Sequence, residues 1–183
     1  MSNELLIRHA SPTLANLKTA NMFNCEFKSQ EELSHDLRCW NNMFSAKGLR
    51  IIPLRIRGNH CLLYLFRPEK LSKDLAKLGA RRILKDRGYR STSTNMCLAE
   101  LRRRLNQQEE FPHEIGLFLG YPVEDVFGFI NHKSLGCKLV GTWKVYGDIK
   151  LAQRKFAQFK KCSELYYQQY KNGTAVDKLA VRA

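Results

Sequence analysis

The sequence predicts an α+β domain that is mostly helical and contains a small antiparallel sheet. Three observations support this fold class. Several segments place apolar residues three or four positions apart, as amphipathic helices do. Gly58-Asn59 is a turn signal inside the stretch 49–66, which therefore predicts a β-hairpin. A later stretch, about 137–146, predicts one further strand before a long C-terminal helix.

The first segment of the chain predicts a short strand followed by the start of a helix. We interpret residues 4–9 as the strand, after which Ser11 caps a helix with Pro12 in its first position. A helix N-terminus of this kind suits a phosphate or carboxylate, although simple capping is the alternative. The candidate ligand-binding residues at this end are His9, Thr13 and Lys18.

The next helix has the clearest start signal. Ser29 and Glu32 form a capping box, whereas residues 21–28 before it are ambiguous and compatible with an extended segment. Pro53, in the first strand of the hairpin, indicates a sheet edge. The apolar stripe predicted for this helix is Leu33, Leu37, Trp40 and Phe44.

The remaining helices follow from proline, glycine and capping signals. Pro68 opens a basic helical region that ends at Gly88 and is interrupted near Gly79. Thr94 caps the next helix, and Asp148 caps the long last one.

Length and composition predict one domain, over residues 1–173, followed by a frayed tail over 174–183. No run approaches the roughly 18 apolar residues of a transmembrane helix, and the N-terminus lacks the pattern of a secretory signal. The six cysteines are scattered without a C-x-x-C pair, which is typical of reduced thiols in a cytoplasmic protein.

Positive charge is the strongest compositional feature, with a net charge of +14. Residues 47–104 contain 16 Lys/Arg against 4 Asp/Glu, and residues 137–183 contain 10 against 3. Residues 105–136 form an acidic island between them, with 1 against 5. We therefore expect an anionic partner, which is a small molecule or cofactor, a nucleic acid or an acidic redox protein.

The acidic island contains the stretch 111–130, FPHEIGLFLGYPVEDVFGFI, which predicts two short helices joined by a tight corner. Pro112 suits the first position of the first helix, and the tripeptide 120–122, Gly-Tyr-Pro, ends it and begins the second. Gly116 and Gly120 leave one face nearly bare, so that a ligand or another backbone can approach it.

His113 is the leading candidate for a site residue. At a helix N-terminus its imidazole is expected to be neutral and able to act as a base or bind a metal or haem iron. The alternative is a histidine that hydrogen-bonds the backbone and fixes the corner. Glu114 is expected to complete helix capping, and Glu124 and Asp125 are explained by their first-turn position, with acid–base catalysis as the alternative.

On the predicted late strand, Lys144 and Tyr146 share one face and Trp143 takes the other. Together with Tyr121, they are candidates for holding the acidic group and the ring of an anionic ligand. The alternative places Trp143 in the core and Lys144 in solvent.

Three strings of residues resemble one bacterial family known only as a domain of unknown function. They are HEIGLFLGYP at 113–122, CKLVGTWKVYGD at 137–148 and HASPTL at 9–14. The family has a cysteine at the position of Ala10, so this difference argues against thiol chemistry there. The resemblance extends over essentially the whole chain and implies a redox or iron-related context without naming a reaction.

The basic region supports an alternative function in nucleic-acid binding. However, three consecutive arginines fan across about 200° of a helix surface and cannot all face one ligand. No helix-turn-helix, RNA-recognition string or zinc finger is present. The candidate phosphate contacts are Arg81, Arg82, Arg87, Arg90, Arg102, Arg103 and Arg104.

The sequence therefore predicts a protein that binds an anionic ligand or cofactor, such as a tetrapyrrole, a flavin or a nucleotide-like molecule. The expected lining residues are His113, Tyr121, Lys144 and Tyr146. A nucleic-acid-binding module and a small enzyme that uses His113 with a nearby carboxylate are the alternatives. The chain contains no familiar phosphate-binding loop and no nucleophile elbow.

Overall fold

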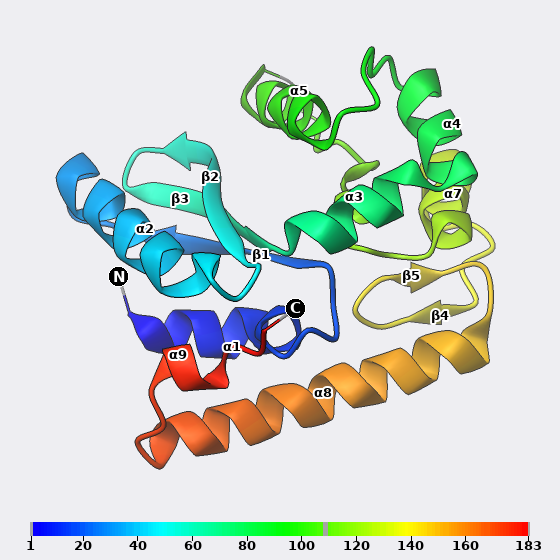
Figure 1. Ribbon diagram of the computed structural model, residues 1–183. Helices are drawn as coiled ribbons and strands as arrows, with labels where there is room; N and C mark the ends of the chain where they lie inside the picture. The colour runs from blue at the N-terminus through cyan, green and yellow to red at the C-terminus, as the bar shows by residue number, and fades with distance from the viewer. Residues whose placement is uncertain (1, 108–109, 183) are drawn as a thin grey trace. The chain divides into compact units, whose positions relative to one another are not determined.

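The computed structural model describes residues 2–107 and 110–182, and it divides the chain into two compact units (Figure 1). The first unit comprises Met1–Glu69 and Phe159–Ala183, and the second comprises Lys70–Gln158. The long helix α8 (Ile149–Lys171) begins in the second unit and ends in the first. Helices and small antiparallel sheets make up both units, so the predicted α+β class is confirmed.

The first unit is built on a three-stranded antiparallel sheet with strand order β1-β3-β2. Its strands are β1 (Ala20–Glu26), β2 (Arg50–Arg57) and β3 (His60–Phe66). The predicted hairpin is confirmed, with Gly58 in its turn at φ +55°. Pro53 lies on the edge strand β2, as expected, beside an irregularity in the ladder. The third strand is the ambiguous segment near 21–28.

Three further helices belong to this unit: α1 (Asn3–Leu14), α2 (Gln30–Ser45) and α9 (Val176–Leu179). Helix α1 contacts β1 and β3, α2 contacts β2, and α9 contacts α1. The Ser29 hydroxyl caps α2 by accepting from the Glu32 N–H at 3.2 Å, as predicted. The predicted stripe of α2 is buried except for Leu37, which is partly buried.

The expectations for the start of the chain are wrong. Residues 4–9 belong to α1, whose N-cap is Ser2. Ser11 lies inside this helix and donates to the Ile7 carbonyl, and Pro12 is in the last turn. The segment is helical because its apolar residues recur at helical spacing and are buried: Leu6, Ile7, Ala10 and Leu14. The anion-binding helix N-terminus expected at Ser11 therefore does not form.

The predicted tail contains helix α9, and residues 176–181 make contacts within the first unit. Val176, Leu179 and Ala180 are buried in the apolar core of the first unit. The Val181 N–H also donates to the Leu14 carbonyl at 2.9 Å. Apolar burial thus outweighs the chain-end position, and Ala183 lies outside the described residues.

A buried arginine joins three parts of the first unit. Arg67 is 1% exposed, and burial lowers the pKa of its guanidinium. It donates to the backbone carbonyls of Thr13 (2.9 Å), Leu14 (2.9 Å), Lys47 (3.1 Å) and Val181 (2.8 Å). The Thr13 and Leu14 carbonyls belong to the last turn of α1, where the helix dipole favours a cation. Arg67 therefore closes this unit by satisfying backbone groups from distant segments.

The second unit is mainly helical. Its elements are α3 (Pro68–Ala76), α4 (Leu78–Asp86), α5 (Thr94–Gln107), α6 (Ile115–Phe118), α7 (Val123–His132), β4 (Leu139–Val140) and β5 (Lys144–Val145). The interruption predicted near Gly79 falls at Lys77. A Cβ on Gly79 would lie 2.7 Å from Val123 Cγ1, so the packing of α4 on α7 requires glycine here.

The strand expected over 137–146 is instead a small hairpin of β4 and β5, and it does not join the three-stranded sheet. The chain reverses at Gly141, whose N–H donates to the Trp143 carbonyl at 3.1 Å. A side chain at Gly141 would overlap the Phe156 ring. Asp148 then caps α8, as predicted, by accepting from the Leu151 N–H at 3.0 Å.

Two observations concern the sequence predictions about cysteines and membranes. All six cysteines are free thiols. Among residues 2–107 and 110–182, no helix has the length and apolar character needed to cross a membrane.

Candidate functional site

A cavity of about 400 Å³ lies in the second unit between α6, α7 and the β4–β5 hairpin. This volume falls within the range of about 300–1,000 Å³ that is typical of small-molecule sites. Most of the lining is apolar or aromatic. The lining residues are Phe111, His113, Ile115, Gly116, Tyr121, Asp125, Val126, Phe129, Trp143 and Lys144.

The corner between α6 and α7 forms as predicted. Gly120 turns the chain at φ +73°, and Pro122 is the N-cap of α7. A Cβ on Gly116 would lie 2.7 Å from Val126 Cγ2 and 3.2 Å from Tyr121 Cδ2. The bare glycine face is therefore used to bring α6 and α7 together, and this close approach shapes the base of the cavity.

Three aromatic rings form a continuous packed group at the hairpin side. Tyr121 stacks on Trp143, with ring centroids 4.9 Å apart and an angle of 29°. Phe156 meets Trp143 edge-on at 4.5 Å. The Tyr121 hydroxyl donates to the Thr142 carbonyl at 3.2 Å, and burial raises its pKa to about 12. Trp143 and Tyr121 thus offer the cavity a preformed aromatic wall.

Asp125 holds the hairpin against α7. Its carboxylate is buried and accepts from Trp143 Nε1 at 2.6 Å, the Tyr146 N–H at 2.7 Å and the Gly147 N–H at 2.8 Å. From the sequence, Asp125 was expected to favour the first turn of α7 through its negative charge. That prediction included none of the three donors. They lie 18 to 22 positions away, so no local pattern reveals them.

Two basic side chains flank one ring of the cavity. The His113 ring meets Phe129 edge-on at 4.9 Å, and Lys144 Nζ lies 5.3 Å from the Phe129 centroid. Lys144 Nζ also contacts Ser134 Oγ at 2.8 Å, and His113 Nε2 lies 3.3 Å from the exposed carboxylate of Glu110. The sequence candidates His113, Lys144 and Tyr121 therefore line one cavity.

The environment predicted for His113 is wrong, because α6 begins at Ile115 and Pro112 lies before the helix in an irregular segment. The prediction assumed that His113 lies in the first turn of a helix that starts at Pro112, and that helix turn does not form. The role of His113 must therefore be argued from its place in the cavity.

Tyr146 lies outside the cavity. Its hydroxyl donates to the Lys133 carbonyl, and its ring packs where a Cβ on Gly128 would stand. Strand β5 ends at Val145, so the shared face expected for Lys144 and Tyr146 is not maintained.

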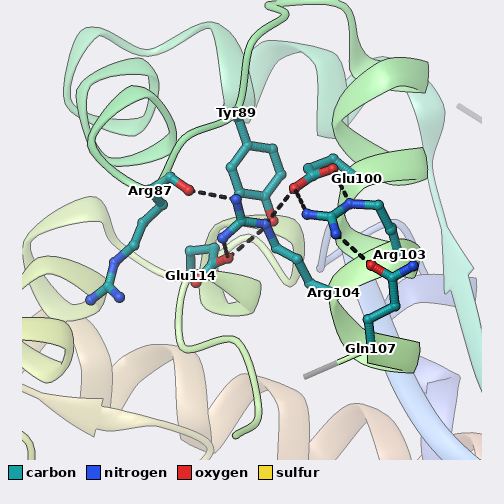
Figure 2. A network of polar contacts seen from close by, with 7 residues as sticks. All are labelled: Arg87, Tyr89, Glu100, Arg103, Arg104, Gln107 and Glu114. Atoms are coloured by element: carbon teal, nitrogen blue, oxygen red, sulfur yellow. Dashed lines mark hydrogen bonds and ion pairs between the residues drawn. The ribbon is translucent and has the colours of Figure 1, made fainter. Parts of the chain in front are cut away.

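Glu114 occupies the N-cap position of α6, but its side chain makes no capping hydrogen bond; it is instead a buried carboxylate, 2% exposed, in a polar network (Figure 2). It accepts from the Tyr89 hydroxyl at 3.1 Å and lies 3.5 Å from Arg104 Nη1. Arg104 also stacks over the Tyr89 ring at 4.6 Å. Burial, followed by the Glu114 charge, raises the pKa of Tyr89.

The N-terminal candidates belong to the first unit and do not line this cavity. His9 is exposed and stacks on Phe23, with centroids 5.6 Å apart. The Thr13 hydroxyl donates to Asn21 Oδ1 at 2.7 Å. Lys18 is 6% exposed, and burial lowers its pKa to about 8.

The basic candidates separate into two groups. Arg90, Arg103 and Arg104 line a second cavity, of about 520 Å³, along α5. The others line neither cavity and have exposed side chains: Arg81, Arg82, Arg87 and Arg102. The structure therefore does not gather all seven arginines at one site.

The structure defines an α+β protein whose second unit holds an aromatic cavity with two basic side chains. The chain belongs to the family described as Protein of unknown function (DUF3793), whose model matches residues 6–180. This match confirms the resemblance found in the sequence and covers parts of both units as one family domain. No curated protein and no solved structure matches the chain.

Proposed function

We propose that this protein binds a small planar aromatic molecule with an acidic group, and that the ligand occupies the cavity between α6, α7 and the β4–β5 hairpin. The observation that carries the proposal is the combination of an aromatic wall with two basic side chains in one preformed cavity. Such sites are mostly apolar, with a few polar groups that set ligand orientation.

The aromatic wall supports a planar ligand. Trp143 is held on one side by Phe156 and through its indole N–H by Asp125. Because these contacts already fix the indole, a ring that stacks beside it loses little affinity to side-chain ordering. Aromatic pairs add about 0.5–1.5 kcal/mol beyond the burial of their area.

The two basic side chains support an acidic group. Lys144 and His113 both contact Phe129, so an anion near this ring is within reach of either. Glu110 and Ser134, their present contacts, lie at exposed positions, where an ion pair contributes little. A ligand carboxylate or phosphate therefore replaces weak contacts with stronger ones.

The cavity volume bears on the ligand class. About 400 Å³ is near the lower end of the usual range for ligand sites. This favours a fused two-ring or three-ring system, such as a flavin or a nucleotide-like base, over a complete tetrapyrrole.

The acid–base alternative receives less support from the geometry. Asp125 accepts three hydrogen bonds, and Glu114 is held by Tyr89 and Arg104. Among the described residues, the carboxylate in contact with His113 is that of Glu110, which is 74% exposed. Within the part of the chain that the structure describes, His113 therefore forms no buried His–carboxylate pair of the kind used in general acid–base catalysis.

A pair of fluorescent probes tests the proposal. 1-Anilinonaphthalene-8-sulfonate and N-phenyl-1-naphthylamine share the fused ring, but only the first has an acidic group. We expect one sulfonate probe to bind per chain, about tenfold more tightly than the neutral probe, because a charge-assisted contact contributes about 1.5–3 kcal/mol. Fluorescence titration measures both affinities.

Matched variants locate the bound probe. Lys144→Met is expected to remove the preference for the sulfonate probe, and His113→Ala to reduce it. Lys138→Met and His132→Ala remove the same side-chain types outside the cavity and are expected to leave both affinities unchanged. The proposal fails if neither probe binds with one-to-one stoichiometry, or if Lys138→Met weakens binding as much as Lys144→Met.

A further inference from the structure

The second cavity of the unit has a different chemical character. It runs along α5 and is bounded by the segment 88–91 that precedes this helix. Its volume is about 520 Å³, and charged side chains contribute much of its lining. The charged and aromatic lining residues are Tyr89, Arg90, Glu100, Arg103 and Arg104.

One carboxylate holds two of the arginines in place (Figure 2). Glu100 accepts from Arg103 Nε at 2.8 Å and Nη2 at 2.7 Å, and from Arg104 Nε at 2.8 Å. Hydrogen bonds from Arg103 and then Arg104 lower the pKa of Glu100 to about 2. Because Glu100 stays ionised at neutral pH, the two guanidinium groups are ordered before any ligand arrives.

The network leaves arginine N–H groups that can donate to a ligand. Each guanidinium carries five N–H donors. Arg103 donates three hydrogen bonds, to Glu100 and Gln107, and its side chain is 50% exposed. Arg90 adds an exposed guanidinium from the segment that precedes α5. Arg103 and Arg90 therefore both have donors to offer at this cavity.

The lining carries an excess of positive charge. The lining contains three arginines and one glutamate, and Glu114, which contacts Arg104 without lining the cavity, offsets one further charge. Arg104 itself is only 13% exposed and is engaged by Glu100, Glu114 and the Arg87 carbonyl. Its role is to order the cavity, and direct ligand contact falls to Arg90 and Arg103.

We propose that this cavity binds the phosphate group of a small molecule, with Arg90 and Arg103 as the residues that contact its oxygens. A tetrahedral phosphate offers acceptors to two guanidinium groups at once, and arginine is suited to this geometry. The site is separate from the aromatic cavity, and the two cavities share no lining residue.

The rim favours a phosphomonoester over the free ion. Met96 is 59% exposed at this cavity, and Ala99 lies beside it on the same helix. A flexible, polarisable side chain of this kind packs on an organic group of irregular shape. Inorganic phosphate has the same anionic chemistry but no group to occupy this part of the cavity.

Titration calorimetry with three probes tests the site on the complete protein. We expect glycerol 3-phosphate, a monophosphate without an aromatic ring for the other cavity, to bind more tightly than inorganic phosphate, and glycerol to bind least. Similar affinities for the monophosphate and the free ion would identify inorganic phosphate as the source of the bound group. A glycerol affinity equal to that of the monophosphate would overturn the proposal, as would the absence of binding at millimolar phosphate.

Arginine variants assign the contacts. Arg103→Gln and Arg90→Ala are each expected to weaken phosphate binding about 10-fold to 100-fold, because each removes a charge-assisted hydrogen bond. Arg102→Ala removes the same charge from the adjacent position of α5, outside the cavity, and is expected to change the affinity less than about threefold. Equal losses in Arg102→Ala and Arg103→Gln would overturn the assignment.

Two further measurements separate the proposal from a folding defect and from nucleic-acid binding. Amide NMR shifts of wild-type protein are expected to move at residues 88–91 and 96–100 on addition of the monophosphate, and shifts confined to other residues would overturn the proposal. A thymidine oligonucleotide that binds tightly, and is weakened equally by Arg81→Ala, Arg102→Ala and Arg103→Gln, would show an extended basic surface in place of this site.

Discussion

The two units of the protein use buried charge in opposite ways. In the first, Arg67 is enclosed by four backbone carbonyls and closes the end of α1 against the C-terminal segment. In the second, Asp125 and Glu114 are buried beside cavities, where they orient Trp143 and Arg104. The first arrangement completes a core, whereas the second holds binding surfaces in shape.

This difference makes the second unit the better candidate for a binding site. Both units bury apolar side chains, but in the first unit the buried Arg67 side chain is bonded by backbone carbonyls. In the second unit, the Asp125 carboxylate accepts from the backbone that directly follows β5, and the Glu114 carboxylate contacts Arg104. Rigid side chains around open volume are what a binding site requires.

The largest effect is expected for Arg67→Met. This change removes the guanidinium that donates to four backbone carbonyls, two of them in buried contacts, and removal of one partner from a buried charged network costs about 3–5 kcal/mol. Urea unfolding followed by circular dichroism measures the loss. Arg50→Met, at an exposed position of β2, is expected to change the free energy of unfolding by less than about 0.5 kcal/mol. Similar values for the two variants would contradict the structural role of Arg67.

Asp125→Ala is expected to cost about 2–4 kcal/mol, because it removes one carboxylate that accepts three hydrogen bonds. It is also expected to abolish binding of the sulfonate probe, since Trp143 loses its anchor. Glu124→Ala alters the adjacent, exposed carboxylate in the same turn of α7 and provides the control. If Asp125→Ala still bound the probe, the Asp125 carboxylate would not be needed to maintain the cavity.

Lys18 adds a pH-dependent test within the first unit. Burial lowers its pKa to about 8, whereas in an unfolded chain the lysine pKa has its ordinary value of 10.5. Between these values the unfolded state binds more protons, so the Lys18 contribution to stability rises with pH. The free energy of unfolding of wild type minus that of Lys18→Met is expected to rise by about 2 kcal/mol from pH 8 to pH 10.

The comparison with Lys18→Met cancels the titration of other groups, such as the Cys162 thiol, whose pKa burial raises to about 11. A difference that stays flat between pH 8 and pH 10 would show that Lys18 is not held in an apolar environment.

The smallest effect is expected for Glu114→Gln. A glutamine still accepts from the Tyr89 hydroxyl, so only the charge opposite Arg104 is lost, at a cost of about 1–2 kcal/mol. Thermal unfolding measures this loss, with Glu110→Gln at the neighbouring exposed position as the control. A loss as large as that of Asp125→Ala would show that both buried carboxylates carry the same structural weight.

Local signals were sufficient for several elements. The Ser29 cap, the hairpin turn at Gly58, the corner at Gly120 and the Asp148 cap each act within a few residues, and the structure confirms all four, although the Glu32 side chain of the predicted capping box accepts from the Lys28 N–H instead of the Ser29 N–H. The same local reasoning failed at Pro12, where burial of the apolar face of α1 carries the helix through the proline.

The site was predicted only in part, because its supports are long-range contacts. His113 and Tyr121 were predicted from the glycine- and proline-containing stretch 111–130, and Lys144 from its aromatic neighbours. All three line one cavity. The buried partners Asp125–Trp143 and Glu114–Tyr89 are 18 and 25 positions apart in the chain. Periodicity and capping rules do not reach over such separations, and they also place Tyr146 on a strand that ends one residue too early.

The most direct test of the aromatic cavity uses Trp143 as the reporter. The chain has two tryptophans, and a Trp40→Phe variant leaves only the one that lines the cavity. Excited at the indole band, this variant is expected to transfer energy to the bound sulfonate probe, with Trp143 emission quenched in one-to-one proportion to binding. Full Trp143 emission when the probe is saturated would place the probe elsewhere and contradict the proposed site.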